Sequence, residues 1–188
     1  MTQISRRQWR MTVAGIACAA ILTPATALAA PAHRAARTAA TPACATSDLR
    51  AWLGIPGEAA LGTTAYQLEL SDISRHACTL SGFPGVSAVA AGGQHLGSPA
   101  ARDHFDPTRL VILRRGATAH VFLRITNVAF LPAAACHPAD AIGLKVFPSG
   151  QRTAIVISFS FRACAKKGPV FLTVRTTVAG TGIPGFST

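Results

Sequence analysis

The sequence has little charge, few acidic residues and few aromatic side chains. Of its 188 residues 13% are charged and 6% are aromatic, with 7 Asp and Glu against 18 Lys and Arg. A charged fraction well below the usual value of about 25% excludes a charge-driven disordered chain. The length suits one domain with a tail at most.

Motifs of familiar catalytic and metal sites are also missing. The chain contains no Gly-x-Ser-x-Gly nucleophile elbow and no His-Glu-x-x-His zinc pair. No two cysteines are spaced as half of a zinc site. Met11 is the only methionine after the initiator, whereas copper sites favour Met or Cys beside His. We therefore predict no resident metal or cofactor.

The first 29 residues have the order of a secretory signal peptide, which is a basic stretch, an apolar run and a small-residue cleavage triplet. These parts are Arg6, Arg7 and Arg10, then Met11 to Leu22, then Ala27-Leu28-Ala29. The apolar run is shorter than the roughly 20 residues of a membrane-spanning helix. We predict cleavage before Ala30 and no integral membrane segment.

Two details bear on the export route and on anchoring. Ser5-Arg6-Arg7-Gln8-Trp9 resembles a twin-arginine signal, and the general export route fits equally well. Cys18 could carry a lipid, but Gly15-Ile16-Ala17-Cys18 lacks the leucine usually found three places earlier. The prediction is a secreted or cell-wall-associated protein without a lipid at Cys18, and the export route stays open.

Cleavage would lower the net charge from +11 to +8 and leave four cysteines, Cys44, Cys78, Cys136 and Cys164. An even number of cysteines in an exported chain predicts disulfide bonds, and four cysteines allow three connectivities. Residues 30–43 consist of Ala, Pro, Arg, Thr and one His. Because this segment has no large apolar side chain, we predict a disordered tether before the domain.

Residues 44–188 contain short apolar runs about ten residues apart, separated by turn residues. In the clearest run Ala119, Val121, Leu123 and Ile125 alternate with polar positions, which predicts a half-buried strand. The other predicted strands are residues 49–53, 65–70, 78–80, 86–90, 110–113, 142–147, 155–161 and 170–177. Eight or nine such strands without a helical period predict an all-β antiparallel sandwich.

Several motifs lie in a fixed order along this domain. They are Cys44 with Ser47-Asp48-Leu49, Cys78-Thr79-Leu80 leading into Gly82-Phe83-Pro84-Gly85-Val86, the turn from Leu113 through Gly116 to Ala119, Ala135-Cys136-His137-Pro138, and Phe161-Arg162-Ala163-Cys164. In this order the chain resembles a secreted bacterial family known as domain of unknown function 4232. The resemblance implies an immunoglobulin-like sandwich without an established activity, bridged between Cys44 and Cys78 and between Cys136 and Cys164.

The densest polar cluster places His104 between Asp103 and Asp106. One interpretation is a general base or metal ligand of an exported hydrolase or metal-dependent enzyme. The interpretation that we favour is a surface loop in which Asp106-Pro107 starts a turn and Asp103 is solvated. His120 lies on the polar face of the 119–125 strand, where we expect a solvent-facing or inter-strand role.

The basic residues are spread along the chain and no aromatic ladder accompanies them, so we predict no nucleic-acid partner. Their charge would attract anionic cell-wall or envelope components, less strongly as salt rises. The sequence favours a secreted, disulfide-bonded, non-catalytic binding module. The alternatives are the exported enzyme that uses the His104 loop and a structural component of the wall.

Overall fold

The structure is a computed structural model that describes residues 40–57 and 59–182, and every structural statement below concerns these residues. The predicted signal peptide, including Cys18, and residues 30–39 of the predicted tether lie outside them. The described residues belong to one compact unit. Among them, no helix is long and apolar enough to cross a bilayer.

The elements of this unit are nearly all strands. They are β1 (Leu49–Leu53), β2 (Ala59–Ala60), β3 (Thr63–Asp72), β4 (Cys78–Ser81), β5 (Gly85–Val89), β6 (His95–Leu96), β7 (Ala101–Arg102), β8 (Leu110–Leu113), β9 (Thr118–Thr126), β10 (Pro138–Phe147), β11 (Ile155–Cys164), β12 (Leu172–Val174) and β13 (Val178–Ala179). Three short helical turns complete the set, η1 (Thr46–Asp48), η2 (Val128–Phe130) and α1 (Ala133–Cys136).

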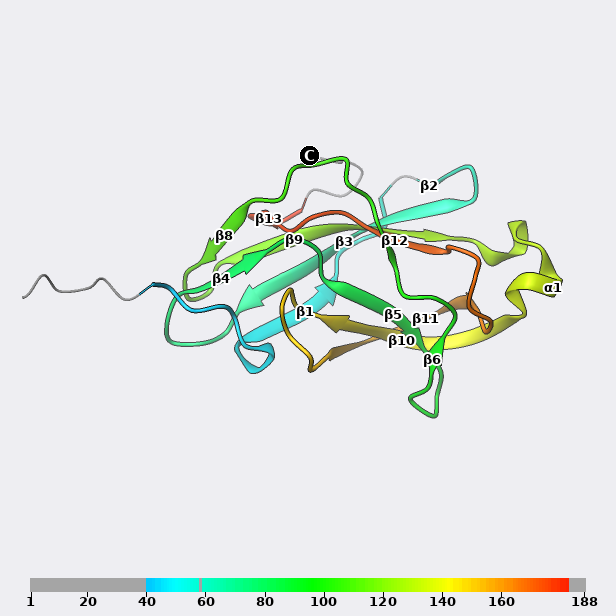
Figure 1. The fold of residues 1–188 in the computed structure, drawn as a ribbon, viewed down its shortest axis with the longest axis horizontal. Helices are drawn as coiled ribbons and strands as arrows, with labels where there is room; N and C mark the ends of the chain where they lie inside the picture. The colour runs from blue at the N-terminus through cyan, green and yellow to red at the C-terminus, as the bar shows by residue number, and fades with distance from the viewer. Residues whose placement is uncertain (1–39, 58, 183–188) are drawn as a thin grey trace, which may run out of the picture. The chain divides into compact units, whose positions relative to one another are not determined.

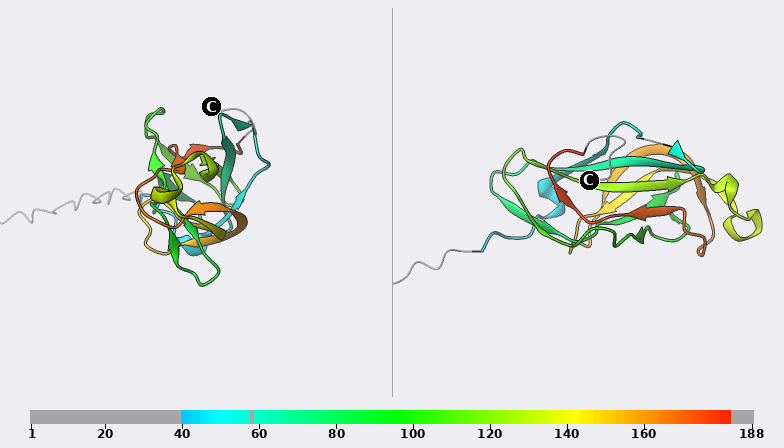
Figure 2. Two further views of the ribbon diagram at one scale, coloured as in Figure 1. Left: turned by 90° about the vertical axis from the view of Figure 1, so that its right-hand side faces the viewer. Right: turned by 90° about the horizontal axis from the view of Figure 1, so that it is seen from above.

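The strands form three sheets (Figure 1). The largest has the order β1-β3-β9-β12-β7, with β2 beside β3 and β13 beside β9. The second has the order β11-β10-β5-β6, and the third pairs β4 with β8. All neighbours are antiparallel except β7 and β12, and the two larger sheets lie in facing layers (Figure 2). The predicted all-β, sandwich-like fold is confirmed.

The nine predicted strands correspond to nine of the observed ones, with the same ends for β1 and β8 and different ends for the other seven. The 170–177 prediction was too long, because only Leu172–Val174 forms β12 before the chain departs from regular pairing at Arg175. The sequence analysis missed β2, β6, β7 and β13, each of which has two residues. Two residues are too few for an alternating pattern to be visible.

The core lies between the sheets and follows the period-two faces of the strands. Leu68 of β3 is paired with Val121 of β9, and both are fully buried. The facing layer contributes Leu144 and Val146 of β10 and Val86 of β5. Each buried side chain of this size stabilises the fold by about 1.5–3 kcal/mol.

The opposite face of β3 and β9 is also covered, which the sequence analysis did not anticipate. Gln67, Glu69 and His120 stand on that face and are all buried. After β13, which pairs with β9 in the sheet, Gly180 and Gly182 of the C-terminal segment Thr176–Gly182 form hydrogen bonds to His120 and Glu69. The predicted alternation holds along residues 121–125 of β9, whereas Gln67, Glu69 and His120 are buried on the face expected to be polar and open, because alternation reports polarity and not what covers a face.

The turn between β4 and β5 helps to hold this covering segment. Gly82 has a φ of +78°, a conformation that side chains with a Cβ rarely adopt. Its carbonyl oxygen accepts hydrogen bonds from both the backbone N–H and the hydroxyl of Thr177, each at 2.9 Å. The Gly82-Phe83-Pro84-Gly85 turn therefore fixes the path of the chain after β12.

Regular pairing begins two residues before the predicted domain boundary. Ala43 forms a parallel bridge with Thr79, and the Pro42 carbonyl accepts the Thr79 N–H at 2.8 Å. The backbone of this sequence can pair although its side chains are too small to join a core. The last two residues of the predicted tether thus make backbone contacts with β4.

Two disulfides close the fold at opposite ends of the sandwich. One joins Cys44 to Cys78 at the start of β4, and the other joins Cys136 of α1 to Cys164 at the end of β11. This is the connectivity that the family resemblance implies, and all four cysteines are fully buried. Each bridge ties a segment with little regular pairing to a strand of the core.

We expect both bridges to contribute strongly to stability. The bridged residues are 34 and 28 positions apart, and the chain-entropy account gives about 3.5–4 kcal/mol for loops of this length. Urea denaturation of Cys44→Ala/Cys78→Ala and Cys136→Ala/Cys164→Ala should show a loss of this order for each pair. Unchanged denaturation midpoints with and without reductant would contradict this role.

Candidate functional site

The predicted Asp103, His104 and Asp106 cluster lies in the loop that follows β7. The Asp103 N–H donates to the Val174 carbonyl at 2.8 Å and so continues the parallel pairing of β7 with β12. The Asp103 carboxylate accepts the N–H of Phe105 at 3.2 Å, which tightens the turn. The loop is thus held against the large sheet, at the side that the C-terminal segment also covers.

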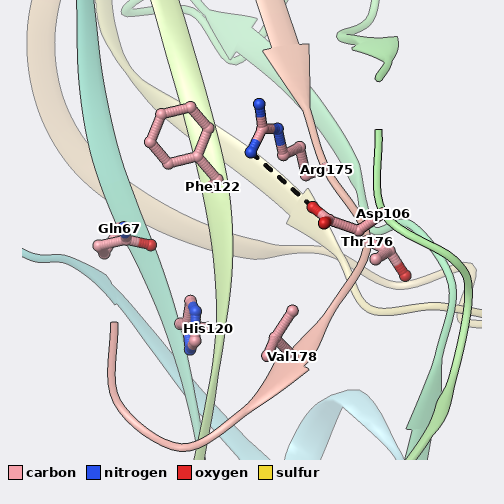
Figure 3. Close-up of a pocket in the computed structure, with 7 residues that line it drawn as sticks. All are labelled: Gln67, Asp106, His120, Phe122, Arg175, Thr176 and Val178. Carbon is pink, nitrogen blue, oxygen red and sulfur yellow. Dashed lines mark ion pairs between the residues drawn. The ribbon is translucent and has the colours of Figure 1, made fainter. Parts of the chain in front are cut away.

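Arg175 is the centre of this region (Figure 3). Its Nε lies 3.2 Å from Asp103 Oδ2, its Nη1 lies 3.8 Å from Asp106 Oδ2, and its side chain is only 11% exposed. The guanidinium carbon is 4.3 Å from the Phe105 ring centroid and 4.9 Å from that of Phe122. A cation paired with carboxylates and held over two aromatic faces is a fixed structural link between loop and sheet.

The two aspartates therefore serve Arg175, and His104 does not join them. Asp103 Oδ2 also accepts from Arg124 Nη2 at 3.2 Å, so one carboxylate bridges two arginines. The exposed His104 ring packs on Phe83 instead, with 4.7 Å between centroids. The favoured interpretation was wrong in one respect, because Asp103 is ion-paired and not simply solvated. The enzyme interpretation gains no support, because no carboxylate orients the imidazole.

The hollow beside Arg175 is too tight to receive a ligand. It has no room for a water molecule, although it lies where polar side chains meet. Its lining is shown in Figure 3 and consists of Gln67, Asp106, His120, Phe122, Arg175, Thr176 and Val178. Packing at this density makes the region a polar core layer and not a substrate pocket.

Glu69 and His120 are held by the covering segment. The Gly182 N–H donates to Glu69 Oε1 at 2.9 Å, and His120 Nδ1 donates to the Gly180 carbonyl at 2.8 Å. Burial raises the pKa of the Glu69 carboxyl, and the Gly182 N–H and the nearby His120 imidazole offset part of that rise. Glu69 Oε2 has no hydrogen-bond partner among the described residues.

Sequence reasoning placed His120 on the correct strand face but did not identify Glu69 and Arg175 as buried charges. Glu69 and His120 are opposite each other in the register of β3 and β9. Pairing these two predicted strands in the sequence analysis could have suggested this contact. Arg175 interrupts the apolar run from Val170 to Val178, and such an interruption was the available signal. In the described part of the chain, no group of three or more His, Cys, Asp or Glu could hold a metal ion.

Two larger hollows lie on the surface of the described residues. One, of about 340 Å³, lies between residues 106–111 and residues 176–179 and has a mainly apolar lining. The other, of about 250 Å³, lies between β3, β9 and β11, where Tyr66 meets Phe159 edge to face at 5.2 Å. The first hollow includes Asp106 with Thr176 and Thr177, but Asp106 pairs with Arg175 and the Thr177 hydroxyl donates to the Gly82 carbonyl. The second has a mixed polar and apolar lining without a carboxylate or an imidazole.

A family model described as "Domain of unknown function (DUF4232)" matches residues 44–180. The chain belongs to the DUF4232 family. The match runs from the first bridged cysteine to Gly180, whose carbonyl binds His120, and so includes both disulfides and the Arg175 cluster. No curated protein matches the chain.

We expect Arg175 to stabilise this DUF4232 domain. Arg175→Met would leave Asp106 without a cation and Asp103 with Arg124 alone in a mostly buried region, at a cost of about 3 kcal/mol. Arg102→Met is the matched control, because Arg102 is exposed and has only a ring contact with Phe83. The control should lose less than about 1 kcal/mol in urea denaturation. Equal losses for the two variants would contradict the assignment.

The Glu69 carboxyl should make stability depend on pH. Its pKa is raised in the folded state, so the fold favours the protonated form and loses that contribution as pH rises through the folded pKa. Relative to Glu69→Gln, the wild type should therefore become less stable as the pH rises above the ordinary Glu pKa of about 4.3. Urea denaturation at pH values below and above this pKa tests the difference, with Asp48→Asn as control. A constant difference at every pH would refute the prediction.

Proposed function

We propose that this DUF4232 domain is a non-catalytic binding module that acts outside the cytoplasmic membrane and attaches to anionic components of the cell wall or envelope. The observation that carries the proposal is how the domain uses its charges. Its described acidic side chains are engaged within the fold, whereas most of its basic side chains project from it.

Each described carboxylate has an internal partner. Asp103 and Asp106 pair with Arg175, Asp140 pairs with Arg162 at 2.7 Å, and Asp48 lies 3.6 Å from His76. Asp72 accepts the Ser74 N–H and Glu69 accepts the Gly182 N–H. These contacts leave few carboxylates on the surface to compensate basic side chains.

Most basic residues lack such a partner. Among the described residues, only Arg124, Arg162 and Arg175 form ion pairs with carboxylates. The exposed basic side chains outside these pairs are Arg50, Arg75, Arg102, Arg109, Arg114, Arg115, Arg152, Lys166 and Lys167. An excess of exposed cations produces a positive field that concentrates polyanions near the surface.

The compartment and the absence of catalysis have separate support. Two disulfides that hold the fold fit an oxidising space outside the cytoplasm, as does the signal peptide that the sequence predicts. The only cluster that suggested catalysis is arranged around Arg175, and its imidazole packs on a phenylalanine. A module with these features has means to bind and no assembled group to activate a nucleophile.

Sedimentation of the purified protein with isolated envelope material tests the proposal. Binding should be strong at about 0.01 M salt and largely lost at about 1 M, where the Debye length falls from about 30 Å to about 3 Å. Binding that is absent at low salt would overturn the proposal, and binding unchanged at high salt would overturn its electrostatic basis. Any hydrolytic turnover that is lost in His104→Ala would overturn the non-catalytic assignment.

A further inference from the structure

Four chain segments meet at the end of the sandwich where β1 and β4 begin. Backbone bonds join three of them, since Ile73 N–H donates to Asp48 O at 2.8 Å and Gly116 N–H donates to Asp72 O at 2.9 Å. The fourth, the turn between β10 and β11, is joined through the Thr46 hydroxyl, which donates to the Thr153 carbonyl at 3.0 Å. Figure 1 shows the β3–β4 and β8–β9 turns side by side at the end of the sandwich where residues 40–48 also lie.

This end carries five arginines, which we call the arginine end: Arg50, Arg75, Arg114, Arg115 and Arg152. All five are exposed, and none forms an ion pair with a described residue. Arg50 belongs to β1, and the other four stand in turns. The fold thus gathers cations that are as far as 102 positions apart in sequence, between Arg50 and Arg152.

The carboxylates at this end do little to neutralise it. Asp72 is buried and accepts the Ser74 N–H. Asp48 is partly exposed but faces His76, with 3.6 Å between Oδ2 and Nε2. Five exposed arginines on adjoining segments thus outnumber the two described carboxylates there, Asp48 and Asp72, although the sequence indicates a scattered arrangement.

The side chains around these arginines restrict the kind of anion. The turns that carry four of them, residues 73–77, 114–117 and 148–154, contain no Phe, Trp or Tyr. Arg50 lies in β1 two residues before the exposed Trp52, which is a single ring and not a series of stacking surfaces. A nucleic acid would need stacking platforms for its bases, and a membrane surface would favour aromatic side chains at the interface. Guanidinium groups suit phosphate in particular, because their donors form paired hydrogen bonds to its oxygens and several arginines can share one chain.

We propose that the arginine end binds a linear polymer that carries repeated phosphate groups and no bases. This inference rests on the proposed function and names the surface and the ligand chemistry for it. A flexible polyanion can follow arginines on four adjoining segments. Each phosphate contact releases condensed counterions, so the affinity should fall steeply as the salt concentration rises.

The test compares two triple variants that remove equal charge. Arg75→Gln/Arg114→Gln/Arg115→Gln alters the arginine end, and Arg102→Gln/Lys166→Gln/Lys167→Gln alters exposed cations elsewhere, including the opposite end beside α1. Binding to linear inorganic polyphosphate is measured over a range of salt concentrations. All six positions are exposed, so both variants should fold. Thermal unfolding of each variant checks this.

The arginine-end variant should bind polyphosphate about tenfold or more weakly, and the slope of log affinity against log salt should fall by about two, at about 0.7 per lost contact. The control should keep most of the affinity and slope. Equal losses of polyphosphate affinity in both triple variants would overturn the assignment of the binding site to the arginine end, while the proposed function would stand. No binding of the wild type to polyphosphate, with salt-sensitive binding to envelope material retained, would do the same.

Three comparison ligands at matched charge test the chemistry. The wild type should bind polyphosphate more tightly than polyglutamate, single-stranded DNA or vesicles with phosphatidylglycerol. Tighter binding to DNA or to vesicles than to polyphosphate would show that the proposed ligand class is wrong. Tighter binding to polyglutamate than to polyphosphate would overturn the preference for phosphate. Failure of the wild type to bind envelope material or any of these anions would overturn the proposed function itself.

Discussion

The ion pairs of the Arg175 guanidinium hold together the segments that lie on the outer face of the large sheet. The guanidinium is nearly buried, and a buried charge is tolerable only when it is paired. Asp103 and Asp106 supply that pairing, and the guanidinium also lies against the rings of Phe105 and Phe122. Through these contacts one side chain holds the loop after β7 and the chain after β12 on the outer face of the large sheet.

This arrangement has a consequence for the surface. The chain has few acidic residues, and the fold uses those that are described for internal pairing, N–H acceptance or contact with His76. What remains outward is an excess of arginine and lysine. The cationic surface therefore follows from composition and also from the use of the described carboxylates in contacts within the fold.

Residue patterns predicted the layered all-β fold well, because nine strands show alternation or apolar runs of sufficient length. They could not predict the burial of Glu69 or His120, since alternation does not say which segment will lie over a polar face. They placed Asp103, His104 and Asp106 in one loop, but contacts over long sequence separations decide their roles. Asp103 and Arg175 are 72 positions apart, and no local pattern connects them.

The same limitation explains why the arginines looked scattered in the sequence. Arg50, Arg75, Arg114 and Arg152 come from segments separated by whole strands, and each segment alone shows at most two adjacent arginines. Antiparallel strands return to the same end of a sheet at every second turn, so residues in alternate connections can become neighbours. The hydrogen bonds between the turns at residues 48, 72–73 and 116–117 make this neighbourhood definite. A domain can thus acquire a specific surface from topology, because the strand order determines which turns share an end.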